Sequence, residues 1–132
     1  MPVAFTVAAP TPAAVWTGRV LSGLAVLFLA FDAGLKVTAN PMAVQGTVEL
    51  GYPASVLGWL GWIQVLCLVL YLVPRLAPLG AVLWTGYLGG AIATHVRLEN
   101  PLFTHVLFPT YVAALLWAGL WLRDRRVRAL LA

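Results

Sequence analysis

The 132-residue sequence is 62% hydrophobic and only 9% charged, and its mean hydropathy is +0.94. A soluble domain carries about 25% charged residues, so this chain has too few charges to cover a water-facing surface. Its length suits a single domain. The net charge is +4, but the basic residues flank apolar segments, which is typical of membrane proteins and argues against nucleic-acid binding.

The N-terminal segment, residues 1–15, contains three prolines and no basic residue. A cleaved signal peptide carries basic residues ahead of its apolar segment. We therefore expect a flexible tail, followed by a first membrane span that acts as an uncleaved signal-anchor.

Four continuous apolar segments follow, at residues 16–37, 54–73, 79–96 and 102–122. Each is close to the roughly 20 residues that an α-helix needs to cross a bilayer. They do not alternate apolar with polar residues, so transmembrane strands are not expected. The sequence predicts an all-α, integral membrane four-helix bundle over residues 16–122, with a basic tail at residues 123–132.

Arginines concentrate at the span ends that would share one side of the membrane. That side carries Arg19, Arg75, Arg123, Arg125, Arg126 and Arg128. Only Lys36 and Arg97 lie toward the other side. The positive-inside rule therefore predicts cytoplasmic N- and C-termini in a cell membrane, with the inner membrane of a bacterium as the expected location. The basic tail is expected to contact anionic lipid.

Both outward-facing connections contain asparagine followed by proline, at Asn40-Pro41 and Asn100-Pro101. Asparagine caps a helix start, and proline suits the first helical position. The first pair predicts a short helix over residues 41–50, ended by Gly51 and lying in the membrane interface. The second pair is expected to start the fourth span.

Small residues recur every four positions on the third predicted span, at Gly86, Gly90 and Thr94. Such stripes let membrane helices approach closely. We expect this one to pack within the bundle, and a homo-oligomer contact is the alternative. The expected counterparts on the first two spans are Ala30, Gly34, Gly58 and Gly61.

Pro109 lies inside the fourth predicted span. It cannot donate a hydrogen bond to the carbonyl of His105, so a kink is expected there.

Apart from the arginines assigned to the cytoplasmic side and Asp124 in the basic tail, the ionisable acids, bases and histidines converge on the outer half of the predicted bundle. Intramembrane charges are costly and commonly mark functional sites. Asp32 and Lys36 lie four residues apart on one helix face and can pair. The candidate catalytic residues are Asp32, His95 and Arg97, and the candidate ligand-binding residues are Lys36, Glu49, Gln64, Tyr87 and His105.

These residues also have structural interpretations. Asp32 and Lys36 could form a neutral pair that fixes packing, Arg97 could belong to a solvated loop pair, and the histidines could be hydrogen-bonded interfacial residues. No HxxxH or HExxH spacing occurs, so no metal site is predicted.

Three segments resemble the DoxX-like family: FLAFDAGLKV, ELGYPASVLGWLGWIQVLCLVLYLVPR and the run from Leu79 to Asp124 that contains GYLGGAIATHVR. The resemblance covers about residues 19–130. It implies a small four-helix membrane protein linked to a quinone-dependent oxidoreductase or to other redox enzymes. It assigns no proven role to individual residues. The single cysteine, Cys67, excludes dithiol chemistry by this chain alone.

Three functions fit these observations. The first is a quinone-linked or redox-associated membrane subunit, with quinone as the cofactor and a membrane or periplasmic redox protein as the partner. The second is a cofactor-free membrane isomerase acting on a small apolar molecule. The third is an assembly protein that binds a partner without catalysis.

Overall fold

A computed structural model describes residues 6–130, and within that range the chain is helical with no strand. The elements in order are α1 (Pro12–Val37), α2 (Pro41–Glu49), the 3-10 turn η1 (Ala54–Val56), α3 (Leu57–Leu72), α4 (Ala77–Arg97), the π-helical turn η2 (Leu102–Val106), α5 (Phe108–Arg123) and α6 (Arg125–Leu130). The predicted all-helical class is therefore confirmed.

The first helix begins earlier than predicted. The side chain of Thr11 accepts a hydrogen bond from the Ala14 amide at 3.2 Å, and Pro12 occupies the first position of α1. This cap and proline together start a helix. Residues 12–15, assigned to the tail from the sequence, therefore belong to α1.

The short helix predicted after Asn40 is present as α2. The Asn40 side chain accepts from the Met42 amide at 3.0 Å. The helix ends at Glu49, and Gly51 follows with a φ of +88°, a conformation that favours glycine. The sequence signals thus place this helix to within one residue, while its location in the membrane interface stays a prediction.

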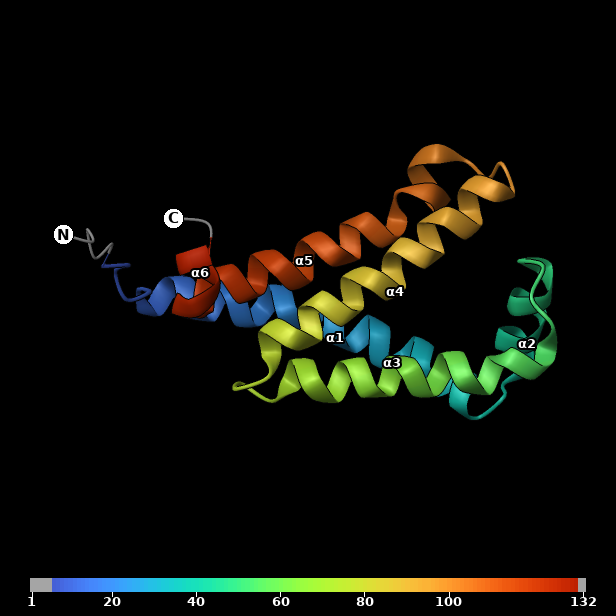
Figure 1. Ribbon diagram of the computed structural model, residues 1–132, viewed down its shortest axis with the longest axis horizontal. Coiled ribbons are helices and arrows are strands. Elements are labelled where there is room, and N and C mark those ends of the chain that lie inside the picture. The colour runs from blue at the N-terminus through green and yellow to red at the C-terminus, as the bar shows by residue number, and fades with distance from the viewer. Residues whose placement is uncertain (1–5, 131–132) are drawn as a thin grey trace.

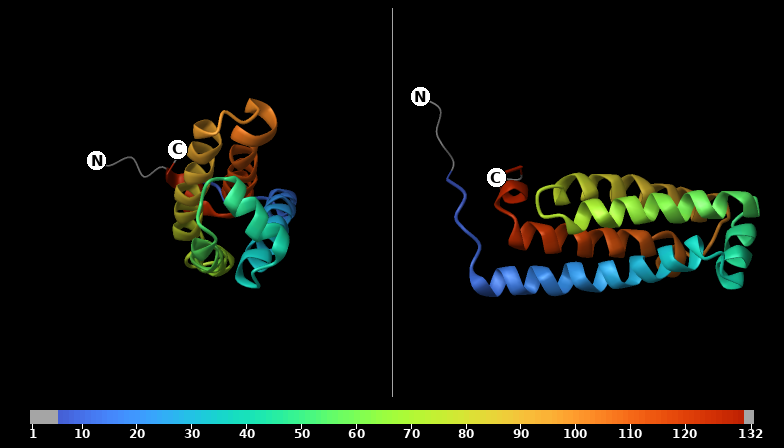
Figure 2. Two further views of the ribbon diagram at one scale, coloured as in Figure 1. Left: turned by 90° about the vertical axis from the view of Figure 1, so that its right-hand side faces the viewer. Right: turned by 90° about the horizontal axis from the view of Figure 1, so that it is seen from below.

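The long helices α1, α3, α4 and α5 run lengthwise beside one another (Figures 1 and 2). α1 contacts α3 and α5, and α4 contacts the same two helices, so α1 and α4 lie on opposite sides of the core. α2 lies across one end of the molecule, and α6 lies at the other (Figure 2). We call these the α2 end and the α6 end.

Two close approaches hold the bundle together near the α6 end. A Cβ added to Gly18 of α1 would lie 2.6 Å from the carbonyl oxygen of Gly119 on α5. A Cβ added to Gly80 of α4 would lie 2.6 Å from the Cα of Tyr71 on α3. Nearer the α2 end, Gly61 of α3 meets α1 at Val37, with 2.9 Å to the backbone nitrogen. Glycine is needed at these positions because a methyl group would collide with backbone.

The prediction that Gly86 and Gly90 pack against another helix is wrong. A Cβ at either position would meet nothing within 4 Å, and the same holds for Gly34 and Gly58, two of the expected counterparts. The reason is that α3 and α4 are close at their connecting turn but diverge toward the α2 end (Figure 1). Gly86 and Gly90 therefore face open space rather than a helix.

Three segments are long and apolar enough to cross a membrane: Pro12–Val37, Ala54–Leu72 and Leu102–Arg123. Large apolar side chains on them point outward, including Leu27 at 72% and Trp59 at 74% exposure. Such a surface fits lipid rather than water. α4 is long enough but is not among the three, since its glycines, threonines and aromatic residues lower its hydropathy.

The last predicted span is interrupted. Residues 102–106 form the π-helical turn η2, and α5 starts at Phe108 with Pro109 in its first turn. The Leu107 amide donates back to the Leu102 carbonyl at 2.9 Å. The break expected near Pro109 is present, and it reorients the chain just before α5.

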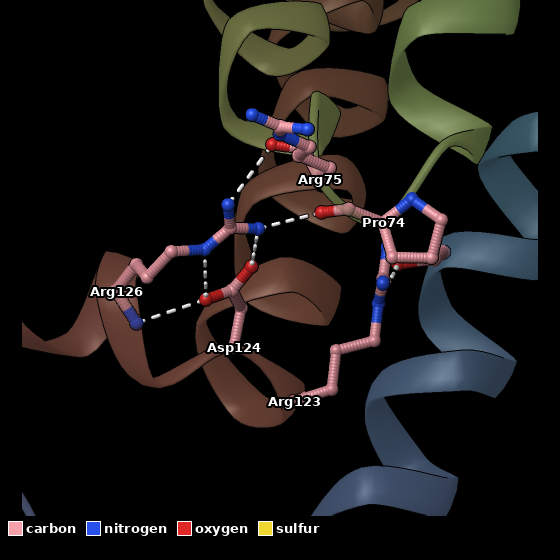
Figure 3. Close-up of polar contacts among 6 residues, drawn as sticks. Pro74, Arg75, Arg123, Asp124 and Arg126 are labelled. Atoms are coloured by element: carbon pink, nitrogen blue, oxygen red, sulfur yellow. Dashed lines mark hydrogen bonds and ion pairs between the residues drawn. The ribbon is translucent and has the colours of Figure 1, made fainter.

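At the α6 end, Arg126 ties the C-terminal helix to the turn between α3 and α4 (Figure 3). Its guanidinium donates to the carbonyls of Pro74 at 2.5 Å and Arg75 at 2.9 Å, and it pairs with Asp124 at 2.7 Å. Hydrogen bonds from Arg126 lower the pKa of the Asp124 carboxyl. The basic segment expected to contact lipid thus also forms an ordered contact with the bundle.

Candidate functional site

A cavity of about 430 Å³ lies in the half of the bundle toward the α2 end, and we call it the bundle cavity. Its apolar wall includes Phe28 and Leu29 of α1 and Phe108 of α5, and Gly86 and Gly90 of α4 also line it. Binding pockets for small molecules have volumes of roughly 300–1,000 Å³ and mostly apolar walls. The glycines leave room for an occupant where larger side chains would fill the space.

A second cavity, of about 470 Å³, lies beneath α2, and we call it the cap cavity. Met42, Ala43 and Gly46 of α2 line it, together with Asn100 and His105 from the connection that follows α4. The residues that line both cavities are Asp32, Lys36, Thr47, Leu50 and His95. These five side chains stand where a mostly apolar space meets a more polar one.

Asp32 is the centre of a small hydrogen-bonded network at this junction. Lys36, one helical turn further along α1, forms an ion pair with its Oδ2 atom, which confirms the pairing predicted from the four-residue spacing. Nε2 of Gln64 on α3 donates to the same oxygen at 2.7 Å. Gln64 is only 1% exposed, and its Oε1 accepts no hydrogen bond within residues 6–130.

The rings of His95 and His105 both line the cap cavity and pack edge-to-face, with centroids 5.7 Å apart and planes at 71°. Nδ1 of His95 lies 2.8 Å from the side-chain nitrogen of Asn100. An amide nitrogen can only donate, so Nδ1 accepts and Nε2 carries the proton. His105 is exposed, and its Nδ1 atom forms a hydrogen bond with the Thr104 hydroxyl at 2.8 Å.

Arg97, a candidate catalytic residue, lines neither cavity. Its Nη2 atom donates a hydrogen bond to the carbonyl of Leu50, the C-cap residue of α2, at 2.6 Å. The guanidinium lies against Gly51, where an added Cβ would be 3.0 Å away. A cation at a helix C-terminus also stabilises the helix dipole. In the structure, Arg97 fastens α2 to α4.

The remaining candidates divide between the two cavities. Tyr87 lines the bundle cavity, and its ring packs edge-to-face on Trp84 with centroids 5.6 Å apart. Glu49 lines the cap cavity and accepts a hydrogen bond from Gln45 at 2.9 Å. The structure therefore brings Asp32 together with Lys36, Gln64 and His95, and it separates Arg97 from them.

Sequence reasoning missed two contributors, Thr47 of α2 and Tyr52 of the following loop. Thr47 is buried and lines both cavities. The Tyr52 hydroxyl reaches Thr94 of α4 at 2.8 Å. A polar residue on the inward face of the short helix was the available signal for Thr47. Tyr52 gave none, because its contact depends on how the loop folds back over α4.

Within residues 6–130, no group of three or more histidine, cysteine, aspartate or glutamate side chains is arranged to bind a metal ion. Ligands of those types normally supply such a site. The polar groups at the junction of the cavities are of types that form hydrogen bonds and transfer protons.

A comparison with models of known protein families gives a match over most of the chain. Residues 20–119 match the family model described as the DoxX-like family. No curated protein and no solved structure matches the sequence.

Proposed function

The chain belongs to the DoxX-like family, and we propose that this membrane protein is a redox-associated subunit whose bundle cavity binds a quinone. One observation carries the proposal: an apolar cavity of about 430 Å³ ends at the Asp32–Lys36 ion pair. A quinone has an apolar body and oxygen atoms on its ring, so it needs both kinds of wall. Gly86 and Gly90 leave space for the ring.

In this proposal α4 also crosses the membrane, as the third of four spans. Its 21 residues extend about 31 Å at 1.5 Å per residue, which matches the hydrocarbon thickness. The arginines of the α6 end would lie in the cytoplasm with both termini, and the α2 end would face outward. The expected location is the inner membrane of a bacterium. The two cavities would then lie in the outer half of the bundle.

Asp32 is the residue best placed to exchange a proton with the occupant. Lys36 and Gln64 both donate to its Oδ2, which leaves Oδ1 to accept a hydrogen bond from a ligand hydroxyl. Asp32 and His95 each line both cavities, so they connect the ligand with the polar space under α2. A bound quinone would supply two-electron chemistry, and a membrane or periplasmic redox protein would exchange those electrons.

The proposal is tested with two neighbouring glycines that differ in one respect. Gly90 lines the bundle cavity and Gly89 does not, yet neither has an atom within 4 Å of an added Cβ. Gly90→Leu should therefore fill the cavity, while Gly89→Leu adds the same side chain outside it. Both proteins are purified in detergent, extracted with organic solvent for bound quinone and titrated with decylbenzoquinone.

We expect the wild type and Gly89→Leu to bind the quinone, and Gly90→Leu to bind at least about tenfold more weakly because its side chain occupies the same volume. A wild-type protein that yields no quinone and binds none would contradict the proposal. Equal binding by the two leucine variants would place the ligand elsewhere.

A cofactor-free isomerase is the second candidate, and it is favoured by the presence of Asp32 and His95 on one cavity. Two proton-transfer groups facing one ligand could move a proton between two of its carbons. Rescue of a deletion strain separates the two functions. An isomerase should rescue a deletion strain that also lacks quinone biosynthesis, whereas a quinone-linked subunit should not.

A further inference from the structure

Tyr87 differs from the other three tyrosines of the chain. Each of those has its hydroxyl hydrogen-bonded to another residue. The partners are Thr94 Oγ1 for Tyr52 at 2.8 Å, the Leu116 carbonyl for Tyr71 at 2.7 Å and the Phe103 carbonyl for Tyr111 at 3.0 Å. The Tyr87 hydroxyl makes no hydrogen bond within residues 6–130, although its half-buried side chain lines the bundle cavity.

The position of Tyr87 makes this absence costly. Tyr87 lies ten residues from each end of α4 (Ala77–Arg97), so it would sit near the middle of a membrane span. Water is scarce at that depth, and an unsatisfied hydroxyl loses hydrogen-bond energy there. Buried tyrosines usually find a partner for this reason. An occupant of the bundle cavity can supply the acceptor that Tyr87 does not have within residues 6–130.

Tyr52, the other tyrosine that lines the bundle cavity, uses its hydroxyl proton in a hydrogen bond to Thr94. Thr94 donates its own hydroxyl to the Gly90 carbonyl at 2.9 Å. The contact between Thr94 and Tyr52 must then be donated by Tyr52, since a hydroxyl has one proton. Of the two phenol groups that line the bundle cavity, only Tyr87 keeps a proton for a ligand.

The surroundings hold Tyr87 ready for that role. Its ring packs edge-to-face, at 84°, on Trp84, which is fully buried. Gly90 and Ala91 follow three and four residues later on the same helix face and also line the cavity. Because both are small, they leave space in the cavity one helical turn beyond Tyr87. A fixed donor next to open space costs a ligand little ordering energy.

We infer that Tyr87 donates a hydrogen bond to a carbonyl oxygen of the molecule in the bundle cavity. It thereby selects a carbonyl-bearing ring over a hydrocarbon of similar shape. This inference rests on the proposed function and adds to it the atom that recognises the oxidised ring. Tyr87 is a specificity-determining residue, and Asp32 remains the group that exchanges a proton.

The test combines two proteins with two probes. Wild type and Tyr87→Phe are each titrated with decylbenzoquinone and with decylbenzene, which has the same chain but no ring oxygens. Binding is measured by native mass spectrometry from detergent micelles. Tyr111→Phe is the matched control, because it loses the same atom from a tyrosine that does not line the bundle cavity. Thermal unfolding of Tyr87→Phe, expected to equal that of the wild type, checks that its fold is intact.

We expect Tyr87→Phe to bind decylbenzoquinone about tenfold more weakly, the effect of one lost hydrogen bond, and to bind decylbenzene as the wild type does. Tyr111→Phe should match the wild type with both probes. Unchanged quinone binding by Tyr87→Phe, or an equal loss for both probes, overturns the inference while the proposed function stands. If the wild type binds neither probe, the proposed function fails and the inference fails with it.

Discussion

At Gly119, α5 approaches α1 so closely that a single added methyl group should separate the two helices. A Cβ at this position would overlap the Ser22 hydroxyl oxygen and lie 2.8 Å from both the Ser22 nitrogen and the Gly18 carbonyl oxygen. Two of these three atoms are backbone, so they cannot rotate away. Gly119→Ala must therefore move the helices themselves or displace Ser22 and its hydrogen bonds.

The cost can be worked from these contacts. Ordinary contact starts at 3.4 Å, so the helices would have to separate by about 0.6 Å, and gaps of that size lose a quarter to a half of each dispersion contact. Overpacking typically costs about 1–3 kcal/mol. The Ser22–Tyr71 hydrogen bond, at 2.8 Å, adds about 1 kcal/mol if it breaks. The better helix propensity of alanine returns nearly 1 kcal/mol. The expected net loss is about 2 kcal/mol.

Gly23 supplies the matched control on α1. A Cβ there meets nothing within 4 Å, so Gly23→Ala should be neutral or slightly stabilising through helix propensity. Both variants are unfolded by titrating SDS into dodecylmaltoside micelles, and helix content is followed by circular dichroism. If Gly119→Ala unfolds at the same SDS fraction as Gly23→Ala, the close approach of α1 and α5 is refuted.

Four further results are expected. Tyr71→Phe should lose about 1–3 kcal/mol in the same SDS titration, because it removes two buried hydrogen bonds; a loss below 0.5 kcal/mol, about the error of such measurements, would contradict the network. The double variant of Asp32→Ala and Lys36→Ala should be more stable than either single variant by about 1 kcal/mol, since each single change leaves one charge without its partner; strictly additive losses would argue against the ion pair. Arg97→Ala should increase proteolysis or hydrogen exchange in α2 while global unfolding changes little, because the Leu50 carbonyl loses its donor. Asp124 has a lowered pKa in the folded state, so the native state binds fewer protons; its contribution to stability is complete above the unfolded pKa of about 3.9 and is lost as the pH falls through the lower folded pKa. Melting temperatures measured from pH 6 to pH 2 should show a smaller acid-dependent loss for Asp124→Asn than for the wild type.

Local sequence signals predicted part of this structure well. Asn40-Pro41 starts α2 where expected, and the spacing of Asp32 and Lys36 gives their ion pair. Both depend on atoms within one or two helical turns. Such short-range geometry is fixed once the backbone is helical.

Features that depend on contacts between residues far apart in the sequence could not be predicted from local patterns. Gly86 and Gly90 carry the same pattern whether a helix or a cavity faces them, and only the divergence of α3 and α4 decides between the two. The sequence pattern groups Arg97 with the polar cluster, but its partner in the structure is the Leu50 carbonyl, 47 residues away. The sequence therefore groups most of the candidate residues at the end of the bundle where the two cavities lie, whereas the contacts of single residues required the tertiary structure.

The spacing of Asp32 and Lys36 also affects how the protein is made. Both lie on α1, so their charges can neutralise each other as soon as that helix forms, before any other helix has been synthesised. A lone charge costs about 2.5–3.5 kcal/mol at the centre of a span and less near its end, where Asp32 and Lys36 lie, and internal pairing reduces this penalty further. Gln64 arrives later in synthesis with α3 and completes the contact. The first helix can thus enter the membrane by itself, and its polar partner Gln64 is added when α3 packs against it.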